Sequence, residues 1–182
     1  MAFPPNVIIV STRGHTPKVG NNVYLAPNVT LVGNVEIEDD ASLWFNVTVR
    51  GDVMPIHIGT QANIQDGSVL HGTYGKYGCI VGPRVTVGHQ VTLHGCTIGR
   101  ESLIGMGSII MDGAEIGEQC LIGAGSLVIE GTKIPPRSLA FGRPAKVIRS
   151  LYPEEIESLT LSADNYLLYK SWYKPEEGPP GS

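Results

Sequence analysis

Residues 98–134 read IGRESLIGMGSIIMDGAEIGEQCLIGAGSLVIEGTKI and carry an aliphatic residue at every sixth position without a break. These positions are Ile98, Ile104, Ile110, Ile116, Ile122, Val128 and Ile134. An α-helix requires apolar residues about every 3.6 positions and a half-buried strand about every 2, so neither explains a sustained period of six. The period predicts a parallel β-solenoid in which each hexad supplies one short strand and one corner, and three hexads form a triangular coil.

The same period covers the preceding part of the chain in three shorter runs. They comprise Leu25, Leu31, Ile37, Leu43 and Val49, then Ile58, Ile64 and Leu70, then Val81, Val87 and Leu93. Irregular steps of nine, eleven and five residues separate the runs, at 49–58, 70–81 and 93–98. Insertions in a solenoid form loops at its corners, often on the face that carries the function. The breaks therefore mark the region in which we expect a site.

The chain divides into an N-terminal segment, a β-helix domain, a C-terminal helical segment and a disordered tail, at residues 1–19, 20–150, 151–174 and 175–182. The sequence Pro153-Glu154-Glu155 predicts the start of a short helix, because proline and acidic residues favour the first helical turn. Ser162 is a candidate N-cap for a second helix, which carries Tyr166. The tail is rich in glycine and proline, a composition typical of disorder.

Composition excludes several classes of protein. The 182 residues carry a net charge of −4, so nothing indicates nucleic acid or an anionic membrane surface as a partner. No apolar run approaches the roughly 20 residues that span a bilayer, and the N-terminus lacks the features of a signal peptide. Cys79, Cys96 and Cys120 are too few for a disulfide framework, and we expect them to pack inside the coils. We therefore expect a cytoplasmic protein that acts on a small molecule.

Three of the five histidines, His71, His89 and His94, lie within 24 residues, beside the second and third breaks. Three imidazoles with an open fourth position form one of the known catalytic zinc arrangements. His71 and His94 each follow an interior aliphatic residue, whereas His89 lies one position further along its hexad, so the three diverge on a single prism. We predict a metal site, and a site between neighbouring subunits would bring the ligands together. His15 and His57 show no such arrangement and are expected to be structural.

Other polar residues surround the same stretch: Arg50, Asp52, Asn63, Gln65 and Asp66. Metal-bound imidazoles require hydrogen-bond partners that set their tautomer and orientation. Asp52 and Asp66 are candidates to hold Arg50, whose planar donor fork matches carboxylates. Gln65 and Asn63 are candidates to orient a metal-bound water or a substrate. The alternative is that Asn63 and Asp66 are ordinary corner residues of the solenoid.

Three segments resemble the γ-class carbonic anhydrases and their bacterial relatives: RGDVMPIHIG at 50–59, NIQDGSVLHG at 63–72 and VTVGHQVTLHGCTIG at 85–99. Similarity continues through LIGMGSIIMDG and SLAFGRPAKVIR and covers about residues 20–150. The resemblance implies an all-β solenoid, a left-handed parallel β-helix of hexapeptide repeats with a C-terminal α-helix. It also implies a homotrimer with one metal ion at each subunit boundary.

The resemblance assigns roles to the candidate residues. His71, His89 and His94 match the three metal ligands, two from one chain and the third from its neighbour. Arg50 and Asp52 match an ion pair at the subunit interface of the family, and Asp66 lies nearby in the sequence. Gln65 and Asn63 match residues near the metal-bound water. Tyr166 matches an active-site tyrosine on the C-terminal helix. Zinc is the implied metal, although imidazole also suits iron, cobalt or nickel.

The implied activity is the reversible hydration of carbon dioxide to bicarbonate by a metal-bound hydroxide. The sequence departs from the best-characterised enzymes of this family at Val53, where they carry a glutamate, and in the loop 72–78, which contains no acid. Both acids serve proton transfer to solvent, so we expect weak or buffer-dependent turnover. Three alternatives are a metal-dependent acyl-coenzyme A thioesterase, a hexapeptide acyltransferase with a histidine base, and a non-catalytic metal-binding trimer.

Overall fold

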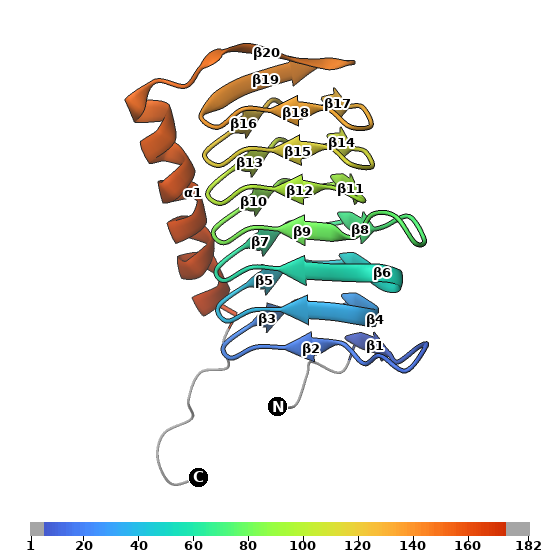
Figure 1. The fold of residues 1–182 in the computed structure, drawn as a ribbon. Helices are drawn as coiled ribbons and strands as arrows, with labels where there is room; N and C mark the ends of the chain where they lie inside the picture. The colour runs from blue at the N-terminus through green and yellow to red at the C-terminus, as the bar shows by residue number, and fades with distance from the viewer. Residues whose placement is uncertain (1–5, 174–182) are drawn as a thin grey trace, which may run out of the picture.

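A computed structural model describes residues 6–173 (Figure 1). The chain forms a left-handed parallel β-helix of about seven turns, and one helix, α1 (Pro153–Ser171), lies along its outside. The predicted all-β solenoid with a C-terminal α-helix is confirmed. Within residues 6–173, no helix combines the length and the apolar character needed to cross a membrane.

The coils stack into a prism with three faces. The first face contains β1 (Ile8–Val10), the N-terminal halves of β4 (Thr30–Ile37) and β6 (Thr48–Ile58), β8 (Val69–His71), β11 (Thr92–His94), β14 (Ile109–Ile110) and β17 (Leu127–Val128). The second face contains β2 (Lys18–Val19), the C-terminal halves of β4 and β6, β9 (Cys79–Val81), β12 (Thr97–Ile98), β15 (Glu115–Ile116) and β18 (Lys133–Ile134). The third face contains β3 (Tyr24–Leu25), β5 (Ser42–Leu43), β7 (Asn63–Ile64), β10 (Thr86–Val87), β13 (Leu103–Ile104), β16 (Leu121–Ile122) and β19 (Ser138–Gly142). β20 (Ala145–Ser150) pairs antiparallel with β19 at the C-terminal end.

The register of these strands stacks the hexad aliphatics in columns. Ile104 pairs with Val87 in one neighbouring coil and with Ile122 in the other, and all three side chains are fully buried. Because each coil offers one such residue per face, three apolar columns fill the prism. The three cysteines are also buried and unpaired among the described residues, as predicted.

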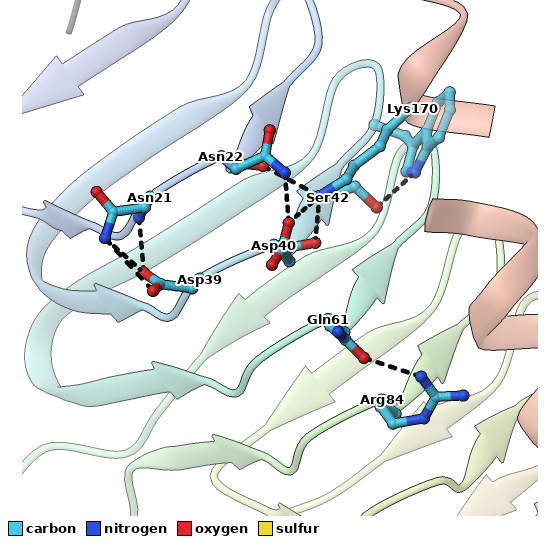
Figure 2. Close-up of polar contacts among 9 residues, drawn as sticks. Asn21, Asn22, Asp39, Asp40, Ser42, Gln61, Arg84 and Lys170 are labelled. Atoms are coloured by element: carbon cyan, nitrogen blue, oxygen red, sulfur yellow. Dashed lines mark hydrogen bonds and ion pairs between the residues drawn. The ribbon is translucent and has the colours of Figure 1, made fainter. Parts of the chain in front are cut away.

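Polar side chains at the corner between the second and third faces fix α1 to the prism (Figure 2). The buried Lys170 donates from Nζ to the backbone oxygens of Asn22 and Asp40, at 3.0 and 2.8 Å, and to Oδ1 of Asp40 at 3.0 Å. Arg84 donates to Oδ1 of Asp164 at 2.8 Å and to Oε1 of Gln61 at 2.8 Å. These contacts hold the helix at two points along its length.

The prediction of two C-terminal helices is wrong. α1 runs unbroken from Pro153 to Ser171, and Ser162 lies inside it. Tyr152 is the N-cap residue of the helix, and its backbone N–H donates to the carboxylate of Glu155 at 2.8 Å. No glycine or proline interrupts residues 154–171, so nothing in the chain ends the helix at the local capping signal. The predicted disordered tail, 175–182, lies outside the described residues.

Candidate functional site

All three breaks in the six-residue period fall at the corner between the first and second faces. The step at 49–58 lies within β6, the step at 70–81 forms the loop between β8 and β9, and the step at 93–98 joins β11 to β12. In Figure 1 the loop after β8 projects on the side opposite α1. The irregular segments therefore collect along one edge of the prism.

At this edge, β8 and β11 place His71 and His94 in register, one coil apart. Nδ1 of His71 lies 3.2 Å from Nε2 of His94. The outer nitrogens face carboxylates: His71 Nε2 lies 3.1 Å from Asp52, and His94 Nδ1 lies 2.7 Å from Asp112. An ionised carboxylate only accepts hydrogen bonds, so each neutral ring carries its proton on the outer nitrogen. The two inner nitrogens then point toward each other.

The protonation states follow from the surroundings. Burial raises the pKa of Asp52, but hydrogen bonds from Arg50, at 2.7 Å, and from His71 outweigh it and hold the pKa below its usual value. Burial also raises the pKa of Asp112, and hydrogen bonds from Thr73, at 2.6 Å, and from the adjacent imidazole again leave it lowered. Burial lowers the pKa of His71 and keeps its ring neutral. Ionised carboxylates beside neutral imidazole are the states that a divalent cation requires.

These residues fit a zinc ion. Zn–N distances of about 2.0–2.1 Å in a tetrahedral site separate two ligand nitrogens by about 3.3–3.4 Å. The observed distance of 3.2 Å between His71 Nδ1 and His94 Nε2 is close to this nitrogen–nitrogen separation. A carboxylate on the far nitrogen of each ring is the usual support of a metal-binding histidine. We call His71, His94, Asp52 and Asp112 the first half-site.

His89 lies at a different corner, between the third and first faces, where its Nδ1 is 2.8 Å from Oδ2 of Asp66. Gln65 and Asn63 are buried on the same side of the prism, and Gln65 Nε2 donates to Asn63 Oδ1 at 3.2 Å. Asn63 in turn donates to Thr86 Oγ1 at 2.9 Å. We call His89, Asp66, Gln65 and Asn63 the second half-site.

One chain does not bring the three histidines together. Among residues 6–173, no group of three His, Cys, Asp or Glu side chains converges as a metal site requires. Two predicted ligands lie in the first half-site and one in the second. The divergence that the hexad positions predict is therefore present, and the width of the first face separates the two half-sites.

Tyr166 belongs with the second half-site. Its ring packs at 80° against that of Trp44, with 5.4 Å between the centroids, and it lines a cavity together with His89 and Asp66. Burial, followed by the charge of Asp66, raises the pKa of Tyr166 to about 12. The phenol therefore keeps its proton at neutral pH and acts as a hydrogen-bond donor rather than as a base.

The remaining predicted residues take the following places. Arg50 pairs with Asp52 as predicted, whereas the carboxylate of Asp66, the other predicted partner of Arg50, lies 2.8 Å from Nδ1 of His89. Val53 lines a polar cavity of about 320 Å³ beside Asp52. His15 lines the same cavity, and His57 lies 3.2 Å from Glu38, outside both half-sites.

Sequence reasoning missed Asp112 and Thr73. Asp112 follows His94 by 18 residues, close to the 17-residue offset at which β11 pairs with β14, so the length of a coil was a signal for it. Thr73 lies in the loop 72–78, which contains no acid. Its hydroxyl reaches Asp112 because the loop folds back, with a bridge between Thr73 and Tyr77.

The chain is similar to hexapeptide-repeat proteins, among them several named carbonic anhydrase. The bacterial transferase hexapeptide family (six repeats) matches residues 16–51 and 95–130. A carbonic anhydrase of Geobacillus kaustophilus is 47% identical over 92% of this chain and 91% of its own length. The mitochondrial gamma carbonic anhydrase 1 of Arabidopsis thaliana is 36% identical over 82% of this chain and 56% of its own length. A crystal structure described as a putative acetyltransferase of Bacillus cereus has a TM-score of 0.90 and 48% identity, covering 92% of this chain and 97% of that one.

Proposed function

Because the chain belongs to the family of γ-class carbonic anhydrases, we propose that it hydrates carbon dioxide reversibly as a zinc enzyme. We further propose a homotrimer in which the first half-site of one chain meets the second half-site of the next. His71 and His94 would then bind the metal from one side and His89 from the other. When bound, zinc supplies a water that ionises near pH 7, which is the nucleophile that this reaction needs.

The observation that carries the proposal is the close approach of His71 Nδ1 and His94 Nε2, which lie 3.2 Å apart. Two nitrogens at this distance share a proton or a metal ion, because two facing lone pairs repel. Asp52 and Asp112 favour the metal ion, because each carboxylate accepts a hydrogen bond from the outer nitrogen of one ring. A carboxylate behind one histidine also suits a general base, but two imidazoles that meet at their inner nitrogens favour a metal over the acyltransferase mechanism.

The second half-site would supply the polar groups that orient the reactants. Gln65 lines a cavity beside His89, and Asn63 holds its amide nitrogen. Gln65 is thus placed to orient water or bicarbonate without competing strongly as a ligand. Tyr166, as a donor that keeps its proton, would hold a substrate oxygen.

Elemental analysis together with a hydration assay tests the proposal. Protein purified without an affinity-metal step is expected to hold about one zinc per chain and to hydrate carbon dioxide. His94→Ala is expected to lose both the metal and the activity, and His57→Ala, a histidine outside both half-sites, to keep both. Less than about a tenth of a metal per chain would overturn the proposal, and iron, cobalt or nickel at full occupancy would change only the metal.

One observation favours a second candidate, a metal-dependent acyl-coenzyme A thioesterase. A largely apolar cavity of about 470 Å³ extends from His89 and Gln65 along the third face. Carbon dioxide needs no such volume, whereas an acyl chain does. Hydrolysis of acyl-coenzyme A by the metal-loaded protein, without hydration of carbon dioxide, would favour this candidate. A metal-loaded trimer without either activity would favour the non-catalytic role.

A further inference from the structure

Aromatic rings from two distant parts of the chain enclose a cavity of about 240 Å³ between the prism and the end of α1. The rings that line it belong to Trp44, Phe45, Tyr166, Tyr169, Trp172 and Tyr173. Two of these residues precede the first half-site in the sequence, and four lie at or near the C-terminal end of α1. The anchors of Lys170 and Arg84 fix the helix at the height where the two groups of rings meet.

Several of these rings lie nearly perpendicular to one another. Tyr166 and Tyr173 lie at 80° and 84° to Trp44, each with its centroid 5.4 Å from that of Trp44. The ring of Trp172 lies beside that of Tyr169, with 4.9 Å between their centroids. Trp172 and Tyr173 are nonetheless 67% and 50% exposed, so much of this aromatic surface is open to solvent in the described chain.

In the described part of the chain, the cavity contains one carboxylate, that of Asp66, which lies 2.8 Å from Nδ1 of His89, a ring that also lines the cavity. Asp66 lines it, and after burial the charge of Asp66 contributes to the raised pKa of Tyr166. Neither lysine nor arginine lines it within residues 6–173. The nearby Lys170 directs its ammonium group to Asn22 and Asp40 and does not line the cavity. Aromatic faces add the negative side of their quadrupoles.

We propose that this cavity binds a quaternary ammonium ion. Such an ion is weakly hydrated and presents only methyl groups, so rings can replace its water without hydrogen bonds. A primary ammonium group would require acceptors on several sides, and one carboxylate does not supply them. A neutral apolar group would gain nothing from Asp66. The cavity shares Asp66, His89 and Tyr166 with the second half-site, but binding of the ion requires neither the metal nor the hydration of carbon dioxide.

The chain provides its own probe, because both of its tryptophans, Trp44 and Trp172, line the cavity. The protein is titrated with choline chloride and, separately, with 3,3-dimethylbutan-1-ol, the uncharged carbon analogue of choline, at constant ionic strength. We expect a saturable change of tryptophan fluorescence with choline at millimolar concentrations, and binding at least about tenfold weaker for the alcohol.

Variants at an exposed position separate recognition from folding. Trp172→Phe is expected to weaken choline binding moderately and Trp172→Ala by at least about fivefold, since tryptophan is the best cation–π partner. Binding in these variants is followed by Trp44 fluorescence and by calorimetry, with circular dichroism as the check of fold. Leu168→Ala, 53% exposed on the same helix and outside the cavity, is expected to bind as the parent does. Equal affinity for the two ligands, no saturation up to about 100 mM choline, or parental affinity in Trp172→Ala would each overturn the inference.

Discussion

Mixed trimers of two metal-deficient variants test whether each metal is shared by two chains. His89→Ala removes the ligand of the second half-site and leaves the first half-site intact, while His71→Ala does the reverse. The two positions lie at different corners of the prism, so neither substitution alters the other half-site. Each variant alone is expected to bind almost no metal, because every boundary in its trimer lacks a ligand.

The expected recovery follows from the geometry of a closed ring. A boundary is complete only where a chain with an intact first half-site is followed by a chain with an intact second half-site. With the two variants co-expressed at equal levels and assorted at random, this occurs at about one boundary in four. Metal content and hydration activity are therefore expected at about 25% of the parent values.

The matched control combines His71→Ala with His94→Ala, which both affect the first half-site. Every boundary in this mixture lacks a ligand, so no recovery is expected. The assay is elemental analysis of the purified mixed protein, with carbon dioxide hydration measured on the same sample. Recovery no greater than in the control would refute the shared site, as would full metal content in either single variant.

Four further predictions concern turnover and stability. Val53→Glu, which adds a carboxylate to the cavity beside Asp52, is expected to raise kcat severalfold at low buffer concentration, with less change in kcat/KM. Added imidazole buffer is expected to have the same effect on the parent protein. Stopped-flow assays that find no dependence of kcat on buffer concentration would contradict this prediction. Glu155, whose pKa falls to about 2 chiefly through its hydrogen bond from Arg149, stabilises the fold fully above about pH 4.5 and progressively less as the pH falls through 2. Glu155→Gln is therefore expected to be less stable than the parent in urea at pH 7, and this difference is expected to shrink as the pH falls toward 2. Glu154→Gln, in the same helical turn, is the control. Lys170→Met is expected to cost about 2–4 kcal/mol of unfolding free energy, because it removes the buried ammonium group that donates to the backbone oxygens of Asn22 and Asp40 and to the Asp40 carboxylate. Lys133→Met, 73% exposed in its pair with Glu115, is expected to cost under about 0.5 kcal/mol. Ile122→Ala is expected to cost about 3 kcal/mol and Ile129→Ala, 47% exposed, less than about 1, both measured by denaturant titration; similar costs at the two sites would contradict the assignment of the core columns.

The sequence by itself determined the solenoid. A period of six that holds from Ile98 to Ile134 predicts a solenoid, in which each aliphatic side chain stacks on another 18 residues away and is removed from water. The breaks in that period also identified the edge where His71 and His94 lie, because extra residues can leave the stack only at a corner. The different position of His89 within its hexad predicted its separation from the other two.

Tertiary structure decided what depends on contacts between distant segments. The local capping signal at Ser162 predicted a second helix, but Lys170 reaches Asp40 across 130 residues of sequence and holds one continuous helix against the prism. Asp112 is recognised as part of the first half-site only when the coils are stacked, since its contact with His94 joins residues of two successive coils. The aromatic cavity has the same origin, because Trp44 and Tyr166 meet only after α1 has docked. A repeated local pattern reports which residues face inward, whereas the partners of a polar or aromatic side chain depend on which segments the fold brings alongside it.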